Sequence, residues 1–283
     1  MRVVYVNGKY LNEDEAKISI FDRSILFSDS IYEVTSVVNK KLIDFNSHMK
    51  RLDRSMKELQ FNKKINHSTI LDFHRKLVEE NNLQEGIVYL QISRGVVDRD
   101  FTIMNNNIEP TIFAFTQEKK ILESENSKKG IKVMTTDDLR WKRCDIKTTQ
   151  LLYPSLAKTD SFKKGFDDAW MIRNGFVMEG TSNNAWIIKN KKILTRQSDN
   201  LILGGITREA VTSCAKALKY EVSTKPFTLV DAQSADEAFI TSATAFVTPV
   251  IKINSSTVGQ GKPGVFTKAL REEYIKQALN NAI

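Results

Sequence analysis

Short apolar runs separated by turn residues open the chain and predict antiparallel hairpins. Residues 3–6 lead into Asn7-Gly8, a dipeptide that favours a tight two-residue turn between strands. Residues 31–38 and 40–45 have the same form and turn at Asn39-Lys40. The beginning of the chain is therefore predicted to be largely β-sheet.

Two amphipathic helices are predicted next. Apolar residues recur at spacings of three and four from Met49 to Leu59, after Asn46 or Ser47 as a candidate cap. A second helix is predicted over residues 69–81, with its apolar side chains on one face. Further strands are expected at residues 86–94 and 110–116.

Residues 117–130 are polar and charged, and this change of character predicts a domain boundary. We expect a smaller N-terminal α/β domain over residues 1–118, a linker over 119–130, and a larger C-terminal domain over 131–283. In the second part, strands are predicted at residues 131–135, 146–149, 168–173, 185–189 and 192–194, and helices at 155–164, 208–218, 234–236 and 265–280. The expected fold class is mixed α/β (α+β), with two domains of largely antiparallel sheet and packed helices.

The composition is that of a soluble globular protein. The 283 residues are 41% hydrophobic and 27% charged, without a stretch of about 20 apolar residues or a secretory segment. We therefore expect a cytoplasmic protein that does not engage a membrane. Cys144 and Cys214 lie far apart and the histidines follow no zinc-type spacing, so reduced, buried thiols and no metal site are expected.

A net charge of +8 raises the alternative of a non-enzymatic protein that binds nucleic acid. However, the lysines are spread along the chain, often beside acidic residues, and no helix-turn-helix or basic arm stands out. A solvated lysine-rich surface explains the charge better, so nucleic acid is not an expected partner. The positive field could attract small anions, including phosphorylated cofactors and dicarboxylic acids.

Three segments contain residues suited to chemistry, although each also has an ordinary structural explanation. Lys147 lies in an extended stretch; it would serve as a nucleophilic amine only in a partly dry pocket, and otherwise points to solvent. Glu179 follows a strand in a turn-like segment. Gly204-Gly205 precedes a helix expected to begin near Arg208, whose first free amides could bind phosphate.

Taken in order, these segments resemble one enzyme family. The chain contains Arg-Trp-x-Arg-Cys-Asp-Ile-Lys ending at Lys147, then Met-Glu-Gly-Thr-Ser-Asn, Leu-x-Gly-Ile-Thr-Arg and Thr-Ser-Ala-Thr. This order and spacing resembles the class IV pyridoxal-phosphate aminotransferases, which include D-alanine aminotransferases, branched-chain aminotransferases and aminodeoxychorismate lyases. The resemblance covers about residues 5–266 and is greatest to the D-alanine aminotransferase members. It implies the fold-type IV architecture of that family.

The resemblance also implies a cofactor, pyridoxal 5'-phosphate, and a set of residues that hold it. Lys147 matches the lysine that forms the Schiff base and then moves the substrate Cα proton, and Glu179 matches the carboxylate that bonds the pyridine nitrogen. Arg51 matches the phosphate-binding arginine. The other implied cofactor contacts are Leu203, Ile206, Thr207, Ser242 and Thr244, the last in place of a threonine that relatives often have where this chain has Ala243.

The residues implied for the substrate indicate a D-amino acid. Tyr32 and Arg99 match residues that trap the substrate carboxylate, whereas the histidine that completes the trap is replaced by Phe101. We expect transamination between D-alanine or another D-amino acid and a 2-oxo acid such as 2-oxoglutarate or pyruvate. A branched-chain L-amino acid aminotransferase and an aminodeoxychorismate lyase are the alternatives. The family also implies a homodimer. Phe246 stands where relatives have an acidic residue.

Overall fold

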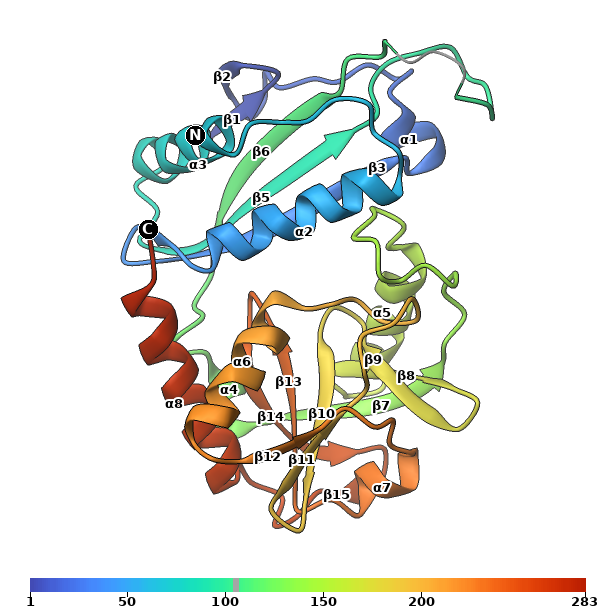
Figure 1. Ribbon diagram of the computed structural model, residues 1–283, viewed down its shortest axis with the longest axis vertical. Coiled ribbons are helices and arrows are strands. Elements are labelled where there is room, and N and C mark those ends of the chain that lie inside the picture. Colours follow the sequence, from blue (N-terminus) through green and yellow to red (C-terminus); the bar gives the residue numbers. More distant parts are fainter. Residues whose placement is uncertain (104–106) are drawn as a thin grey trace. The chain divides into compact units, whose positions relative to one another are not determined.

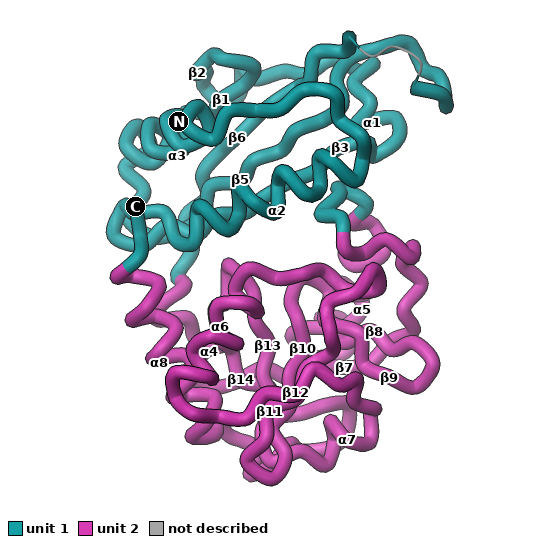
Figure 2. Tube along the Cα trace, in the orientation of Figure 1, with its two compact units in different colours: residues 1–120, 146–150, 281–283 teal, residues 121–145, 151–280 magenta. Residues whose placement is uncertain are grey.

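The computed structural model describes residues 1–103 and 107–283, and these divide into two compact units. Unit 1 contains residues 1–120, 146–150 and 281–283, and unit 2 contains residues 121–145 and 151–280 (Figure 2). The expected division into two α/β domains thus has a counterpart here, but the chain crosses between the units more often than the sequence suggested.

Unit 1 is built on an antiparallel sheet, whose described strands run in the order β2-β1-β6-β5-β3-β4 (Figure 1). Both predicted hairpins are present. In the first, Tyr5 pairs with Tyr10 and the turn places Asn7 and Gly8 at φ 45° and 88°, the left-handed region that this dipeptide tolerates. The strands are β1 (Val3–Val6), β2 (Lys9–Asn12), β3 (Ser30–Val38), β4 (Lys41–Leu42), β5 (Glu85–Ser93) and β6 (Thr111–Glu118).

Helices α2 (Phe45–Glu58) and α3 (His67–Glu80) bury their apolar faces against this sheet, and a short α1 (Arg23–Phe27) precedes β3. Leu52 of α2 and Phe73 of α3 are each 1% exposed, as the predicted periodicity requires. The predicted caps of α2 are wrong, because the helix begins earlier, after Asp44 in a left-handed conformation at φ 54°.

The segment that contains Lys147 belongs to unit 1, which corrects its expected place in the C-terminal domain. The cause is backbone pairing with the start of β3: Tyr32 donates its amide to the Lys147 carbonyl at 3.0 Å, and Thr149 donates to the Ser30 carbonyl at 3.2 Å. Ile146 anchors the segment further by entering the core beneath α2 and α3.

Unit 2 contains a mixed nine-stranded sheet in the order β12-β11-β10-β13-β14-β7-β8-β9, with β15 paired to β14. The β7–β8, β7–β14 and β11–β12 pairs are parallel and the others are antiparallel. The strands are β7 (Ile131–Asp137), β8 (Asp168–Arg173), β9 (Phe176–Gly180), β10 (Asn184–Lys189), β11 (Lys192–Thr195), β12 (Glu221–Ser223), β13 (Glu237–Ser242), β14 (Phe246–Ile253) and β15 (Ser256–Thr257). The helices are α4 (Glu125–Lys129), α5 (Leu152–Lys163), α6 (Ile206–Ala217), α7 (Leu229–Gln233) and α8 (Val265–Asn280).

Several predictions for unit 2 are confirmed and others are wrong. The strand at 168–173 and the helix at 265–280 have the predicted bounds. Most of the expected linker, residues 121–130, belongs to unit 2, where Ile121 is fully buried and its carbonyl accepts a bond from Arg271 at 2.7 Å. The helix predicted at 234–236 is misplaced. Helix α7 begins earlier, at a capping box formed by Thr228 and Asp231, and ends before Ser234.

Within residues 1–103 and 107–283, no helix combines the length and the apolarity that a bilayer crossing requires. Cys144 and Cys214 are both buried, and neither forms a disulfide.

Truncating Phe73 should destabilise unit 1. Its ring stacks on that of Tyr5, with centroids 4.2 Å apart, and its removal leaves a cavity beneath the sheet. We expect Phe73→Ala to lower the free energy of unfolding by about 3–5 kcal/mol in urea titrations. The matched control is Arg75→Ala at an exposed position of the same helix. Equal stabilities for the two variants would contradict this packing.

Candidate active site

Lys147 is held in place by hydrogen bonds of its backbone on two sides. Its carbonyl accepts the amide of Tyr32, and its own amide donates to the Ser55 hydroxyl of α2 at 3.4 Å. The half-buried side chain places Nζ 4.0 Å from the centroid of the Tyr32 ring. The structure therefore brings together two of the predicted site residues, an amine and a phenol ring, at the edge of a rigid sheet.

Arg51 projects from α2 onto a buried carboxylate that the sequence did not single out. Its Nε and Nη2 donate to Oε1 and Oε2 of Glu33 at 2.8 and 2.7 Å, and Nδ1 of His48 lies 2.7 Å from Oε2. Glu33 is 1% exposed and points to the helix-covered face of β3, opposite to Tyr32. The sequence did contain a signal for Glu33: it is an acidic residue in the apolar strand between Ile31 and Thr35, and a charge on a buried strand face requires a partner.

The electrostatics of Glu33 follow from these partners. Burial by itself raises the pKa of the carboxyl group, but the charge of Arg51 and the hydrogen bonds from Arg51 and His48 outweigh burial and lower the pKa to about 2. Glu33 is thus ionised at neutral pH, so the Nδ1 of His48 is the donor in their hydrogen bond.

Arg99 lies in an exposed loop, against aromatic rings. Its guanidinium carbon is 5.4 Å from the ring centroid of Phe27 and 5.2 Å from that of Phe101. The Phe101 side chain is 77% exposed and offers no hydrogen bond to an anion. The carboxylate of the neighbouring Asp100 accepts bonds from the amide and hydroxyl of Thr102.

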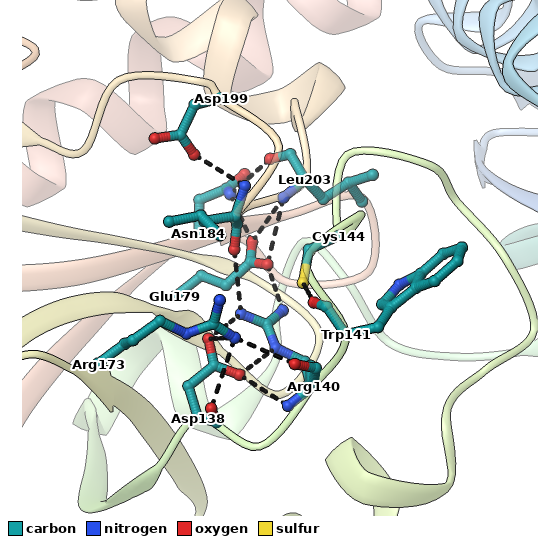
Figure 3. Close-up of polar contacts among 10 residues, drawn as sticks. Asp138, Arg140, Trp141, Cys144, Arg173, Glu179, Asn184, Asp199 and Leu203 are labelled. Carbon is teal, nitrogen blue, oxygen red and sulfur yellow. Dashed lines mark hydrogen bonds and ion pairs between the residues drawn. The ribbon is translucent and has the colours of Figure 1, made fainter.

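Glu179 lies within strand β9, one residue before its end, rather than in a turn after the strand, and is 4% exposed. Oε1 accepts a bond from Arg140 at 2.5 Å, and Oε2 accepts one from the side-chain Nδ2 of Asn184 at 3.0 Å. The backbone amide of Leu203 lies 3.2 Å from both oxygens (Figure 3). Burial raises the pKa of Glu179, against the lowering effect of Arg140 and of the Leu203 amide. This contact joins two predicted site residues, Glu179 and Leu203.

A further buried carboxylate fixes Arg140. Asp138 accepts bonds from Nε and Nη2 of Arg140 at 2.8 and 3.0 Å, and it forms an ion pair with Arg173 at 3.1 Å (Figure 3). Opposite charges therefore alternate from Glu179 through Arg140 and Asp138 to Arg173. Sequence reasoning assigned no role to Arg140, Asp138 or Arg173, because the contacts that link Arg140 to Glu179 and Asp138 to Arg173 join residues more than 30 positions apart.

Helix α6 begins at Ile206, two residues before the predicted start, and Gly205 at its N-cap provides no side-chain cap. Ile206 and Thr207 are 8% and 3% exposed. A β-carbon on Gly205 would lie 2.1 Å from Oδ1 of Asn184, so a larger residue would displace this side chain from Glu179 and Leu203. The uncapped first turn presents backbone amides and the positive end of the helix dipole, which suits an anion.

Ser242 is the last residue of β13 and Thr244 lies in the tight connection to β14, and both are half-buried. Ser242 pairs with Phe246, which has φ 55° and is 1% exposed. The Phe246 ring packs edge-on against Tyr274 at 4.9 Å. Phe246, which stands where relatives have an acidic residue, therefore packs in the core of unit 2.

Known proteins resemble this chain both in sequence and in fold. The family described as "Amino-transferase class IV" matches residues 30–253. D-alanine aminotransferase of Staphylococcus aureus (strain MSSA476) is 35% identical over 285 aligned residues, covering 100% of both chains. The branched-chain amino acid aminotransferase of Escherichia coli has a similar fold, with a TM-score of 0.90, 21% identity and coverage of 98% of this chain and 94% of that one. The T.th. branched-chain amino acid aminotransferase, solved with pyridoxamine 5'-phosphate, gives a TM-score of 0.89 at 24% identity, with 99% and 94% covered.

Glu33 should make the stability of the protein depend on acid pH. Because folding lowers its pKa from 4.5 to about 2, its contribution is complete above pH 4.5 and is lost as the pH falls toward 2. We expect Glu33→Gln to cost on the order of 3 kcal/mol in urea unfolding of the cofactor-free protein at pH 7, and progressively less below pH 4.5. Exposed Glu80→Gln is the control and should follow the wild type. A cost of Glu33→Gln that does not vary with pH would contradict the ion pair.

Proposed function

The chain belongs to the class IV aminotransferases, and on that premise we propose that it moves the amino group of a D-amino acid, D-alanine first, to a 2-oxo acid such as 2-oxoglutarate or pyruvate. Membership of the family makes it a pyridoxal-phosphate-dependent enzyme that acts on amino and 2-oxo acids. The observation that carries the proposal is the amine of Lys147, held above the Tyr32 ring by a segment bonded to β3.

Lys147 is proposed as the catalytic amine. The bound cofactor supplies an electron sink that allows the Cα–H bond of the substrate to break. Lys147 would hold the cofactor through its Nζ, and the same amine, when free, would accept the Cα proton of the substrate and later donate it back. The backbone bonds on both sides of Lys147 limit how far Nζ moves between these two tasks.

Glu179 fits the nitrogen of the pyridine ring. A buried carboxylate is the partner that keeps such a nitrogen protonated, and a positive charge beside Glu179 would in turn favour its ionised form. Arg140, Asn184 and the Leu203 amide hold the carboxylate in one orientation. The same contact supports the proposal that Leu203 packs against the ring.

The cofactor phosphate is proposed to bind at Arg51 and at the start of α6. Ile206 and Thr207 offer the first-turn amides of a helix without a side-chain cap, and the close approach at Gly205 is consistent with a backbone shaped for an anion. The hydroxyls of Ser242 and Thr244, on either side of Ala243, are the further proposed contacts.

Tyr32 and Arg99 are proposed to receive the substrate carboxylate. The full-length similarity to a D-alanine aminotransferase supports the D-amino acid assignment. A branched-chain L-amino acid is the second candidate, because Phe101 replaces a hydrogen-bonding histidine with an apolar ring beside Arg99. An aminodeoxychorismate lyase activity would be recognised by release of pyruvate from that substrate.

We also propose that the enzyme is a homodimer located in the cytoplasm. Large apolar side chains remain exposed on each unit, a feature that marks interaction surfaces. They include Ile20 and Ile25 in unit 1, at 72% and 55%, and Leu152, Leu156 and Phe162 in unit 2, at 75%, 59% and 59%. Two buried cysteines that do not form a disulfide are typical of proteins in a reducing compartment.

Lys147→Ala should abolish transamination and the yellow colour of the cofactor-bound protein, while far-UV circular dichroism stays unchanged. The loss should exceed about a thousandfold, because both the covalent attachment and the proton transfer disappear. Lys142→Ala, at an exposed position of the same loop, is the matched control. Retained turnover in Lys147→Ala would exclude this residue as the catalytic amine.

Substrate choice can be read from the first half-reaction alone. The yellow enzyme, mixed separately with D-alanine, L-alanine, D-leucine and L-leucine, should lose its visible absorbance fastest with D-alanine. Faster bleaching by L-leucine, with D-alanine inert, would replace the D-amino acid assignment by the branched-chain one.

A further inference from the structure

One buried charged group in unit 1, Glu33, is not used by the chemistry proposed above. We propose that Glu33 is a positioning residue, which fixes the guanidinium of Arg51 in the orientation that receives the cofactor phosphate. The inference rests on the proposed phosphate role of Arg51 and adds a residue that does not touch the cofactor itself.

The geometry of the pair defines the orientation of Arg51. Two nitrogens of the guanidinium, Nε and Nη2, donate to the two oxygens of one carboxylate at 2.8 and 2.7 Å. A bidentate pair of this kind sets both the plane of the guanidinium and its direction, whereas a single bond would leave it free to rotate. The side chains are 1% exposed for Glu33 and 10% for Arg51, so water does not compete readily for these bonds.

His48 restrains the carboxylate on its other side. Its Nδ1 donates to Oε2, the oxygen that also accepts Nη2 of Arg51. His48 and Arg51 are three residues apart on α2 and share one face of the helix. Glu33 therefore binds two side chains of α2 to strand β3. Tyr32 is the residue that directly precedes Glu33 in this strand.

These contacts fix α2 in relation to Lys147 within unit 1. Helix α2 is bound to β3 through Glu33, and β3 is bound to the Lys147 segment through Tyr32. The Ser55 hydroxyl on α2 also accepts the Lys147 amide. Arg51 and Lys147 are thus held on one connected framework. Because the Lys147 backbone has its own bonds to Tyr32 and Ser55, loss of the Glu33–Arg51 ion pair should change the orientation of Arg51 more than the position of Lys147.

Two effects of Glu33 on a phosphate oppose each other. Its negative charge weakens the attraction of Arg51 for an anion, whereas its two hydrogen bonds keep the guanidinium from adopting other rotamers. Orientation dominates, because a guanidinium already held in place by Glu33 spares the entropy of ordering a long side chain when the anion binds to its remaining N–H groups.

The test compares the affinity for pyridoxal 5'-phosphate with that for pyridoxal, which lacks the phosphate. The cofactor-free form of the full-length protein is titrated with each compound, and the ratio of the two dissociation constants reports the phosphate contact alone. The variants are Arg51→Met, Glu33→Gln, Glu33→Asp and the double variant Arg51→Met/Glu33→Gln, with exposed Glu80→Gln as the control.

Arg51→Met should reduce the preference for the phosphorylated compound, and Glu33→Gln should reduce it roughly tenfold, the effect of one lost charge-assisted hydrogen bond. Glu33→Asp keeps the charge but withdraws the carboxylate by one methylene, so it should also lower the preference. The double variant should match Arg51→Met, since Glu33 acts through Arg51. Glu80→Gln should retain the wild-type ratio.

The outcomes separate this inference from the proposed function. If Arg51→Met lowers the preference but Glu33→Gln leaves it unchanged or raises it, Glu33 does not position Arg51, and the phosphate role of Arg51 stands. An unchanged ratio in Glu33→Asp would show that the charge of Glu33 matters and its geometry does not. If Arg51→Met itself has no effect, the phosphate role of Arg51 fails and the inference fails with it. Should Glu33→Gln not fold, Glu33→Asp decides the question.

Discussion

Each unit of this protein contains a buried carboxylate that stays in place only because several donors converge on it. Removing a carboxylate from water is costly unless its oxygens are hydrogen-bonded, so the surrounding elements must be positioned to supply those bonds. In unit 1, Glu33 joins β3 to α2 through Arg51 and His48. In unit 2, Glu179 joins the end of β9 to Arg140 and to Leu203, just before α6. The candidate active-site residues are attached to these same elements.

The same framework holds the proposed catalytic amine, Lys147, in place. Lys147 is one of many lysines in a basic chain, and neither its position in sequence nor its residue type distinguishes it. It is distinguished by a backbone held by β3 and α2, with its amine above the Tyr32 ring. Family membership assigns chemistry dependent on pyridoxal phosphate, and the proposed roles of Lys147, Glu179 and Arg51 give each rigid element a task in it.

The sequence predicted elements better than it predicted contacts. Apolar periodicity located α3 and α8, because the pattern of buried positions in a helix is local. It could not show that Lys147 pairs with β3, since that contact joins residues more than a hundred positions apart. Glu179 was interpreted as a turn residue because its neighbours are glycine, threonine and serine, although strand pairing buries it. The candidate site residues came from resemblance, whereas Glu33, Asp138 and Arg173 emerged only once their partners were visible.

The central claim is that the ε-amine of Lys147 carries the cofactor. The most direct measurement is mass spectrometry of a protease digest after reduction of the yellow protein with borohydride, which makes the attachment permanent. The account predicts a phosphopyridoxyl mass increase on the peptide that contains Lys147 and on no other lysine peptide. Attachment at a different lysine, or a reduced protein without the added mass, would contradict it.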